Sequence, residues 1–314
     1  MLTLGIVIVN WNAGEPLTEC LRSIFMATQT CFRLSGVVVV DNGSALRPLS
    51  SSILETPQLT VLRNSVNRGF AAACNQGAAC LCTDFLLFLN PDASVKPDTL
   101  DKAISLLEPL DNAKIAVCGV SMIDPFGRPS FCGARFPTPQ FFLREMLGLN
   151  QLLGRLVTPR LFTSKDLTGS QFIDQVIGAF FLVRSRVFEE LRGFDERFFV
   201  YFEEVDFSLR VRDAGYLSYH LAEAEAVHIG GGCSEQDIAS RLFYSVRSRL
   251  VYARKHFAPL PRGILFLATL IIEPLTRILK CVCSGSWQTL QDTVRAYHRL
   301  FVAIFRGTLY GLYR

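Results

Sequence analysis

The amino-acid sequence predicts an α/β fold, with a mainly parallel sheet covered by helices on both faces and a helical extension at the C-terminal end. Three observations lead to this prediction. Over the first 120 residues, short apolar runs rich in β-branched side chains alternate with segments of helical periodicity. The runs are continuously apolar, which is typical of parallel strands buried on both faces. Beyond residue 238 only helical periodicity remains.

The alternation places the elements of the first 120 residues. We expect strands at Leu4–Val9, Gly36–Val40, Leu59–Arg63, Phe85–Leu89 and Ile115–Val120. We expect helices between them, near Pro16–Ala27, Phe70–Cys82 and Pro97–Leu107. In open sheets of this kind the ligand binds outside the carboxyl ends of the strands.

The second half of the sequence is less regular. Residues 121–172 are rich in Pro, Phe and Gly, and we expect an irregular excursion over the mouth of a pocket. A strand is expected at Gln175–Arg184, followed by a helix from Ser185 to about Leu191. Glu203–Ala214 has the pattern of an amphipathic helix that ends at Gly215.

Polar clusters follow three of the predicted strands where each strand ends. They are Asn10-Trp11-Asn12, Asp41-Asn42-Gly43-Ser44 and Asn90-Pro91-Asp92. Because these strand ends share one edge of the sheet, the clusters predict one shared pocket. Within it, Asp92 could ligate a divalent cation that bridges diphosphate oxygens. The alternative is that Asn-Pro-Asp forms a turn without a ligand.

Three further side chains are candidates for chemistry. His228 precedes Gly230-Gly231-Gly232, where glycine permits close approach of a ligand, so a ligand contact and a structural role both stay open. Glu203 and Glu204 follow the aromatic run 198–202. Carboxylates beside aromatic walls tend to have a raised pKa, which suits a general base. Capping of the helix that begins here is the alternative role.

Amide side chains and glycine also open the helix predicted from residue 70. Asn67, Gly69 and Asn75 have the chemistry for a sugar or phosphate contact at a helix N-terminus. The sequence contains neither a Gly-x-Gly-x-x-Gly fingerprint nor a Walker loop. Dinucleotide binding and ATP hydrolysis are therefore poor interpretations.

Charge divides the sequence into an acidic body and a basic tail. Residues 240–314 contain 12 Lys and Arg against Glu273 and Asp292, whereas the rest contains 26 acidic and 20 basic residues. Two apolar helical faces are expected in the tail, one of Leu242, Phe243, Val246, Leu250, Ala253 and Phe257, and one of Leu290, Val294, Tyr297, Phe301 and Ile304.

The tail favours peripheral membrane contact over a bilayer span. Its apolar run Gly263–Ile272 is too short to span a bilayer, and Arg and Lys flank it, which is typical of interfacial helices. Packing on the domain or on a partner subunit is the alternative. The tail has no recognised nucleic-acid-binding motif, so no nucleic-acid partner is expected.

Cysteine usage and the N-terminal sequence indicate a cytoplasmic protein. None of the ten cysteines forms a Cys-x-x-Cys pair, which argues against zinc-ribbon and thioredoxin-like sites. Met1 leads directly into the run Leu4–Val9 without a basic leader, so no secretory signal is expected. Reduced, mostly buried thiols are the expectation.

Taken in order, these motifs resemble the inverting glycosyltransferases of family 2, especially their rhamnosyltransferase-like branch. The resemblance covers about residues 1–232. It is carried by Val9-Asn10-Trp11-Asn12, Asp41-Asn42-Gly43-Ser44, Asn67-x-Gly69-Phe70-Ala71 through Asn75-x-Gly77, Leu89-Asn90-Pro91-Asp92, Gly178-Ala179-Phe180, Gly193-Phe194-Asp195-Glu196-x-Phe198-Phe199, Glu203-Glu204-x-Asp206 and His228-x-Gly230-Gly231.

The resemblance implies a GT-A fold over residues 1–238, with a nucleotide-binding half at about 1–120 and an acceptor-binding half at about 121–238. Residues 239–314 would then be a separate basic amphipathic helical region. The implied donor-binding residues are Asn10, Asn12, Asp41, Asn67, Gly69, Asn75, Asn90 and Asp92. Asp92 and His228 are implied to hold magnesium or manganese, and Glu204 to be the catalytic base beside Glu203.

Two positions depart from the family's pattern. Asn90 replaces the first carboxylate of the usual Asp-x-Asp, although Asp92 remains. Glu204 stands where Asp is more common, and its extra methylene shifts the carboxylate, so Glu203 stays open as an alternative base.

The implied reaction is a single displacement with inversion, from a nucleotide-diphosphate sugar to a glycan or lipid-linked acceptor. The expected setting is cell-surface polysaccharide synthesis at the inner face of the cell membrane. The expected donor is dTDP-L-rhamnose, with a UDP-hexose or UDP-galactofuranose as alternatives. A catalytically silent nucleotide-sugar-binding scaffold is the rival function.

Overall fold

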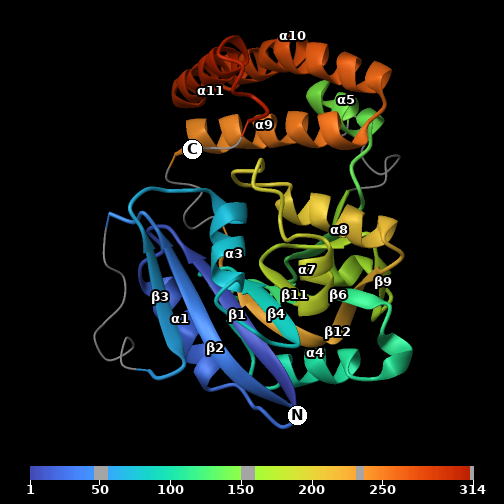
Figure 1. The fold of residues 1–314 in the computed structure, drawn as a ribbon. Helices are drawn as coiled ribbons and strands as arrows, with labels where there is room; N and C mark the ends of the chain where they lie inside the picture. The colour runs from blue at the N-terminus through green and yellow to red at the C-terminus, as the bar shows by residue number, and fades with distance from the viewer. Residues whose placement is uncertain (46–55, 150–159, 231–236, 312–314) are drawn as a thin grey trace. The chain divides into compact units, whose positions relative to one another are not determined.

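The computed structural model describes residues 1–45, 56–149, 160–230 and 237–311. The chain divides into two compact units (Figure 1). The first unit comprises Met1–Phe136, Leu161–Asp195 and Glu203–Cys233. The second comprises Pro137–Arg160, Glu196–Phe202 and Ser234–Arg314.

A mixed sheet forms the centre of the first unit (Figure 1). Among the described residues it has nine strands in the order β3-β2-β1-β4-β11-β6-β12-β5, with β9 paired to β12. The strands are β1 (Leu2–Asn10), β2 (Phe32–Asn42), β3 (Leu59–Asn64), β4 (Phe85–Leu89), β5 (Ala93–Val95), β6 (Ile115–Ile123), β9 (Gln171–Ile173), β11 (Phe180–Arg184) and β12 (Leu217–His228). Strands β3, β2, β1 and β4 are parallel, as are β6 and β12, whereas β11 runs antiparallel between β4 and β6. The predicted α/β class with a mainly parallel sheet is therefore confirmed.

Helices cover both faces of this sheet, because successive strand residues point to opposite sides. Ile6 and Ile8 of β1 join an apolar cluster with α1 and α4, whereas Val7 and Val9 join a second cluster with α3, α7 and α8. The helices of the unit are α1 (Glu15–Phe25), α3 (Phe70–Ala78), α4 (Thr99–Leu107), α7 (Ser185–Glu190) and α8 (Glu203–Asp213), with short turns η1 (Leu110–Asn112) and η3 (Ser164–Asp166).

The single strand predicted at Gln175–Arg184 is wrong, because the chain changes sheets within it. Its first part is β10 (Gln175–Val176), which pairs with β7 (Phe131–Ala134) in a second sheet that β8 (Leu161–Thr163) completes. Its second part is β11 in the main sheet. The intervening residues 177–179 carry Gly178, and this change of sheet brings them to the edge where β4 ends.

The irregular excursion predicted at residues 121–172 is also wrong in part. The described residues of this stretch hold β7, β8, β9 and α5 (Pro139–Met146), while residues 150–159 lie outside the described chain. These strands are three or four residues long, too short to show a period. Strand β12 was not predicted, because its register shifts between Leu221 and Glu225 and interrupts the alternation.

The second unit is helical in its main part, as the sequence predicts beyond residue 238. Its helices are α9 (Ile238–His256), α10 (Pro259–Cys283), α11 (Trp287–Phe305) and α5. The predicted face of α9 is buried at Phe243, Val246, Leu250 and Ala253. No helix in the described part of the chain has an apolar stretch long enough to cross a bilayer.

The second predicted apolar face, on α11, is divided between the buried and the exposed side of the helix. Tyr297 is 5% exposed, whereas Val294 and Phe301 are 54% and 49% exposed. Apolar residues lie on both sides of α11, so the period alone could not choose the packed side. Arg247 on α9 is also fully buried, and its guanidinium donates hydrogen bonds to the carbonyls of residues 197 and 311.

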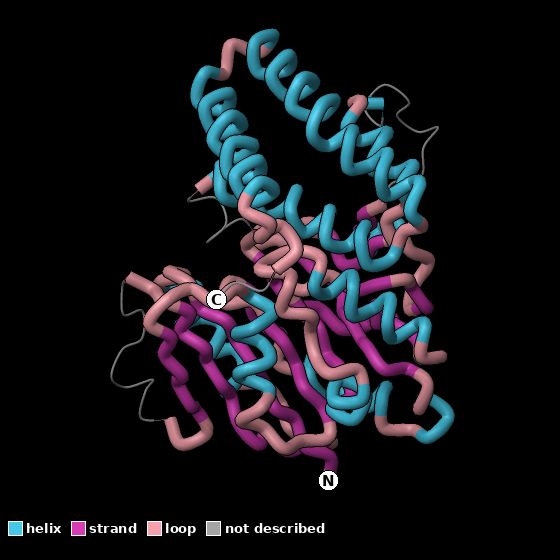
Figure 2. The backbone as a smooth tube through the Cα atoms, turned by 45° about the horizontal axis from the view of Figure 1, so that its top comes forward, coloured by secondary structure: helices cyan, strands magenta, loops and turns pink. Residues whose placement is uncertain are grey.

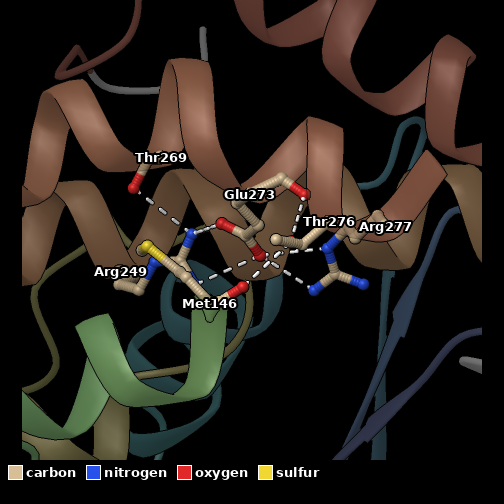
Figure 3. A network of polar contacts seen from close by, with 6 residues as sticks. All are labelled: Met146, Arg249, Thr269, Glu273, Thr276 and Arg277. Carbon is tan, nitrogen blue, oxygen red and sulfur yellow. Dashed lines mark hydrogen bonds and ion pairs between the residues drawn. The ribbon is translucent and has the colours of Figure 1, made fainter. Parts of the chain in front are cut away.

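A buried polar network joins α9, α10 and α5 (Figure 3). Glu273 of α10 accepts hydrogen bonds from Arg249 of α9 and from Arg277, whose nitrogens lie 2.9 and 3.0 Å from its carboxylate. The Thr276 hydroxyl donates to the carbonyl of Met146 at the end of α5, at 2.9 Å. Burial alone would raise the pKa of Glu273, but the charges of both arginines outweigh it and hold the pKa below its usual value.

Candidate active site

Polar side chains interlock at the carboxyl ends of β1 and β2. Asn10 is completely buried, and its Nδ2 donates to Asp41 Oδ1 at 3.2 Å and to Ser44 Oγ at 3.1 Å. Ser44 Oγ also accepts the N–H of Asn12 at 2.9 Å. Asn12 has a φ of 54°, and its side-chain oxygen accepts the N–H of Ala45 at 2.9 Å. This edge therefore brings together Asn10, Asn12 and Asp41, as predicted from their positions at the strand ends.

Asn42 holds the loop between β3 and α3 against this edge. It is almost completely buried, and its Nδ2 donates to Asn67 Oδ1 at 2.9 Å and to the Gly69 carbonyl at 3.1 Å. Its Oδ1 accepts from Asn64 Nδ2 at 3.1 Å and from the Arg68 N–H at 3.0 Å. Two donor hydrogens and both acceptor positions of the amide are thus used. Asn42 belongs to the motif Asp41-Asn42-Gly43-Ser44, but the sequence predicts no role for it.

The close approach of this loop requires glycine at position 43. Gly43 has a φ of 79°, and a Cβ there would lie 2.8 Å from the backbone nitrogen of Asn67. Gly69 has a φ of 88° and is the N-cap residue of α3. The Gly69 N–H donates to Asn67 Oδ1 at 2.9 Å, which fixes the entry to the helix.

Asn75 has a different set of partners from the other predicted donor-binding residues. Its Nδ2 donates to the Phe194 carbonyl at 2.8 Å, and its Oδ1 accepts the Phe194 N–H at 2.9 Å. Arg210 reaches the same turn, where it donates to the carbonyls of Leu191 and Gly193 while it pairs with buried Asp206 at 2.9 Å. These contacts fix the turn that leads from α7 toward α8.

Asp92 and His228 lie together although one follows β4 and the other ends β12. His228 Nε2 is 3.4 Å from Asp92 Oδ1 and 3.5 Å from Asn90 Nδ2. The pairing of β12 with β5 holds them there, since His228 is in register with Ala93. Burial alone would raise the pKa of Asp92, but the hydrogen bond and charge of His228 and two backbone N–H groups outweigh it, so the pKa lies below its usual value. Gly231, which follows in the sequence motif, lies outside the described residues.

Two residues at this position have side chains that could ligate a divalent cation. Within the described ranges, no three His, Cys, Asp or Glu side chains gather into a cage of protein ligands. Asp92 offers a carboxylate and His228 an imidazole, with side chains 12% and 18% exposed. Magnesium is commonly bound by one or two carboxylates together with substrate phosphates, and imidazole is a ligand for transition metals.

Glu203 and Glu204 begin α8 and differ in their surroundings. Glu203 is 5% exposed, and burial, followed by the charge of Glu204, raises its pKa well above the ordinary value. Glu204 is half-buried. Directly before them, Tyr201 and Phe202 have φ values of 68° and 71°, a conformation that bulky residues seldom adopt and that occurs at functional sites.

The turn before β11 brings the glutamates and the Asn90–Asp92 segment to the same edge. The Asn90 N–H donates to the Ala179 carbonyl at 3.0 Å, because β11 pairs with β4. The neighbouring Gly178 packs on Glu204, since a Cβ at position 178 would lie 3.7 Å from Glu204 Cγ. The structure thus places two segments far apart in sequence on either side of Gly178-Ala179.

The chain belongs to glycosyl transferase family 2. The model of that family matches residues 5–192, which is more than half of the chain. It is therefore a glycosyltransferase, as the sequence motifs predict.

Named relatives include rhamnosyltransferases. An N-acetylglucosaminyl-diphospho-decaprenol L-rhamnosyltransferase of Mycobacterium tuberculosis is 26% identical over 265 residues, which cover 79% of this chain and 83% of the relative. Rhamnosyltransferase WbbL of Escherichia coli is 28% identical over 146 residues, which cover 46% of this chain and 52% of the relative. These similarities support the predicted rhamnosyltransferase-like branch of the family.

Solved structures share the fold. The mannosyltransferase PcManGT from Pyrobaculum calidifontis, in complex with GDP-Man and Mn²⁺, superposes with a TM-score of 0.51 and 17% identity, over 98% of this chain and 81% of that one. GalNAc-T7 with UDP, GalNAc and Mn²⁺ gives a TM-score of 0.55 and 15% identity, over 90% and 58%. At these identities the likeness shows the fold alone.

Proposed function

We propose that this glycosyltransferase moves a hexosyl group from a nucleotide-diphosphate sugar by a single displacement that inverts the anomeric centre. The first candidate donor is dTDP-L-rhamnose, which the named rhamnosyltransferase relatives support. The acceptor is a glycan or a lipid-linked glycan of cell-surface polysaccharide synthesis. The lipid-linked choice is supported by the diphospho-decaprenol in the name of the mycobacterial relative.

The donor nucleotide is assigned to the edge formed by β1, β2 and the loop before α3. Half-buried Asp41 receives the base, and Asn12, Asn67 and Gly69 line its pocket. Completely buried Asn10 acts through Asp41, which it holds by a hydrogen bond. Asn75 acts in the same indirect way through the turn at Phe194.

Asp92 and His228, with Asn90 beside them, are assigned to the diphosphate end of the donor. Their carboxylate and imidazole would hold magnesium or manganese, which would neutralise charge on the departing diphosphate. The lowered pKa of Asp92 keeps its carboxylate ionised at neutral pH, as a ligand for such a cation must be.

Glu204 is assigned as the general base that accepts the proton of the attacking acceptor hydroxyl. It is half-buried, whereas Glu203 is 5% exposed and has a pKa that burial raises well above the ordinary value. A base must be accessible and ionised before it can accept a proton. Glu203 is therefore the less suitable base.

The observation that carries this proposal is the junction at Gly178-Ala179. The Ala179 carbonyl binds the Asn90 N–H, and Gly178 packs on the side chain of Glu204. Glu204 and the Asn90–Asp92 segment therefore flank one turn, which supports their assignment as the base and the diphosphate-binding segment.

The test is donor turnover by the purified chain. dTDP-L-rhamnose, a panel of UDP-hexoses and UDP-galactofuranose would each be supplied with a polyprenyl-diphosphate-linked acceptor, with magnesium, manganese or EDTA, and nucleotide release would be measured. We expect release from one donor, loss of release in EDTA and recovery with manganese. Nucleotide binding without release from any donor, with acceptor present, would favour a silent scaffold.

A further inference from the structure

Helix α10 carries an exposed apolar stripe along its whole length. The stripe residues are three or four positions apart and are each between 47% and 74% exposed: Leu260, Ile264, Leu267, Ile271, Leu275, Leu279 and Val282. This spacing puts them on one side of the helix. The opposite side, with Leu265, Thr269 and Glu273, is buried. Helix α10 is therefore apolar on the side that the rest of the described chain leaves uncovered, which is uncommon for a surface helix.

Helix α11 has a second exposed stripe of larger side chains. Trp287, Val294, Phe301 and Phe305 are 71%, 54%, 49% and 95% exposed. The side of α11 that packs on α9 carries Ala296 and Leu300 instead. Helices α10 and α11 both pack on α9 through buried residues, and Figure 2 shows how the backbones of these three helices are arranged. The exposed stripes lie on other sides of the two helices.

The exposed charge on these two helices is of one sign. Their acidic residues are Glu273 and Asp292, which are 3% and 7% exposed and are paired with arginines. Arginine and lysine therefore supply the charged groups at the surface of α10 and α11, among them Lys280 and Arg295. A surface that combines uncovered apolar side chains with cations alone is complementary to an anionic lipid bilayer.

A cleft beside the α11 stripe also suits a phosphate headgroup. It has a volume of about 620 Å³, lies between α9 and α11, and is lined by His298, Arg299 and Arg306. His298 is three residues before Phe301, so the lining of the cleft adjoins the apolar stripe on the helix surface.

We propose that the exposed stripes of α10 and α11 form a docking surface for an anionic lipid bilayer, in which the two helices lie in the plane of the interface. The surface, here called the lipid-facing stripe, consists of the eleven apolar residues named above. Docking on a bilayer would bring the enzyme to a lipid-linked acceptor. The purpose of the docking surface therefore rests on the proposed function. Membrane binding itself can be measured without any sugar transfer.

A second copy of the chain is a less suitable occupant. Pairing two copies through this face would bring their cations together without exposed carboxylates on α10 or α11 to neutralise them. Lipid phosphates would instead neutralise the same groups. Within the described residues, no helix has an apolar stretch long enough to cross a bilayer, and this includes α10.

The experiment is flotation of the full chain with vesicles. Vesicles of phosphatidylcholine with about 30% phosphatidylglycerol would be compared with pure phosphatidylcholine, at low and high salt. The triple variant Leu267→Ser/Ile271→Ser/Leu275→Ser changes exposed positions alone and should fold. The matched control is Phe126→Ser, an 81% exposed apolar residue of the first unit.

We expect the wild-type chain and Phe126→Ser to float with anionic vesicles, and the triple variant to bind at least tenfold more weakly. We also expect high salt and pure phosphatidylcholine to weaken wild-type binding. Emission of Trp287 should shift to the blue on vesicle addition, and this shift should disappear in Trp287→Phe. Equal flotation of the triple variant would overturn the proposal, as would a concentration-dependent dimer that the triple variant abolishes.

The failure of this proposal can be separated from failure of the proposed function. Nucleotide release in detergent with a short-chain acceptor does not require a bilayer. If flotation fails while release persists, the docking surface is wrong and the transferase assignment stands. If flotation succeeds but no donor gives nucleotide release, the docking surface stands and the transferase assignment is wrong.

Discussion

Asp92 Oδ1 lies 3.4 Å from His228 Nε2, at the point where the short strand β5 pairs with the end of β12. The two side chains are far apart in the sequence. Their meeting depends on the antiparallel pairing of β12 with β5, which returns the chain to the segment that follows β4. This pair gives the diphosphate end of the proposed site its carboxylate and its imidazole.

The first prediction concerns this pair. Asp92→Asn keeps the size of the side chain but removes its charge, so we expect manganese-dependent binding of the nucleotide diphosphate to weaken on the order of 100-fold. Isothermal titration with and without manganese measures the effect. The matched control is Asp98→Asn, an exposed aspartate paired with Lys102, which should bind as wild type. Undiminished metal dependence in Asp92→Asn would remove Asp92 from the site.

The second prediction concerns Asn42. Asn42→Leu leaves the Asn67 and Gly69 oxygens and the Arg68 N–H without their buried partner. We expect a loss of roughly 1–3 kcal/mol in the free energy of unfolding and a raised KM for the donor. Denaturant unfolding and donor titration measure the two effects. Asn112→Leu, which loses a hydrogen bond to the Leu106 carbonyl, is the control for a similar change away from the site; its KM should be unchanged.

The positions of Asn42 and its partners illustrate how much of the site the sequence predicts. Asn10, Asp41 and Asp92 follow apolar runs, and a strand end in a parallel sheet determines where such residues meet. The supporting contacts were not predictable, because they depend on side-chain geometry across loops. Nothing in the spacing indicates that Asn42 fills four hydrogen-bonding positions or that Asn75 binds the backbone of Phe194.

The third prediction concerns Glu203 and pH. The pKa of Glu203 is higher in the folded state than in the unfolded state. At pH values between these two pKa values the folded state binds more protons, so the free energy of unfolding falls as the pH rises through this range. Glu203→Gln removes this dependence. We expect the variant and the wild type to be equally stable well below the ordinary glutamate pKa, and the variant to gain about 1.4 kcal/mol per pH unit above it. Urea unfolding between pH 4 and pH 8 measures the difference; a constant difference across that range would contradict the raised pKa.

The fourth prediction concerns the buried network of the second unit (Figure 3). Glu273→Gln leaves Arg249 and Arg277 without their shared carboxylate, and Arg249 is itself buried. We expect a loss of about 3–5 kcal/mol in the unfolding free energy of this unit. The control is Glu19→Gln, which breaks an exposed pair with Arg22 and should change stability by less than about 1 kcal/mol. Similar small effects in both variants would show that the buried pair does not stabilise the unit.

The helices of the second unit show where periodicity stops being sufficient. Helix α9 has one predicted apolar face, and its residues Val246 and Leu250 are buried. On α10 and α11 both sides are apolar, so the sequence could not tell the packed side from the exposed one. The apolar residues on the exposed sides of α10 and α11 are also the observation from which the lipid-facing stripe is inferred.

The most direct test of the central claim compares Glu204→Gln with the wild-type chain in acceptor-dependent nucleotide release and in donor binding. Loss of the general base should lower turnover by roughly 100- to 10,000-fold. Donor affinity should stay within about twofold, because Asp41, Asp92 and His228 are untouched. Turnover close to wild type in Glu204→Gln, or a loss of donor binding in proportion to the loss of turnover, would contradict the assignment of Glu204 as the base.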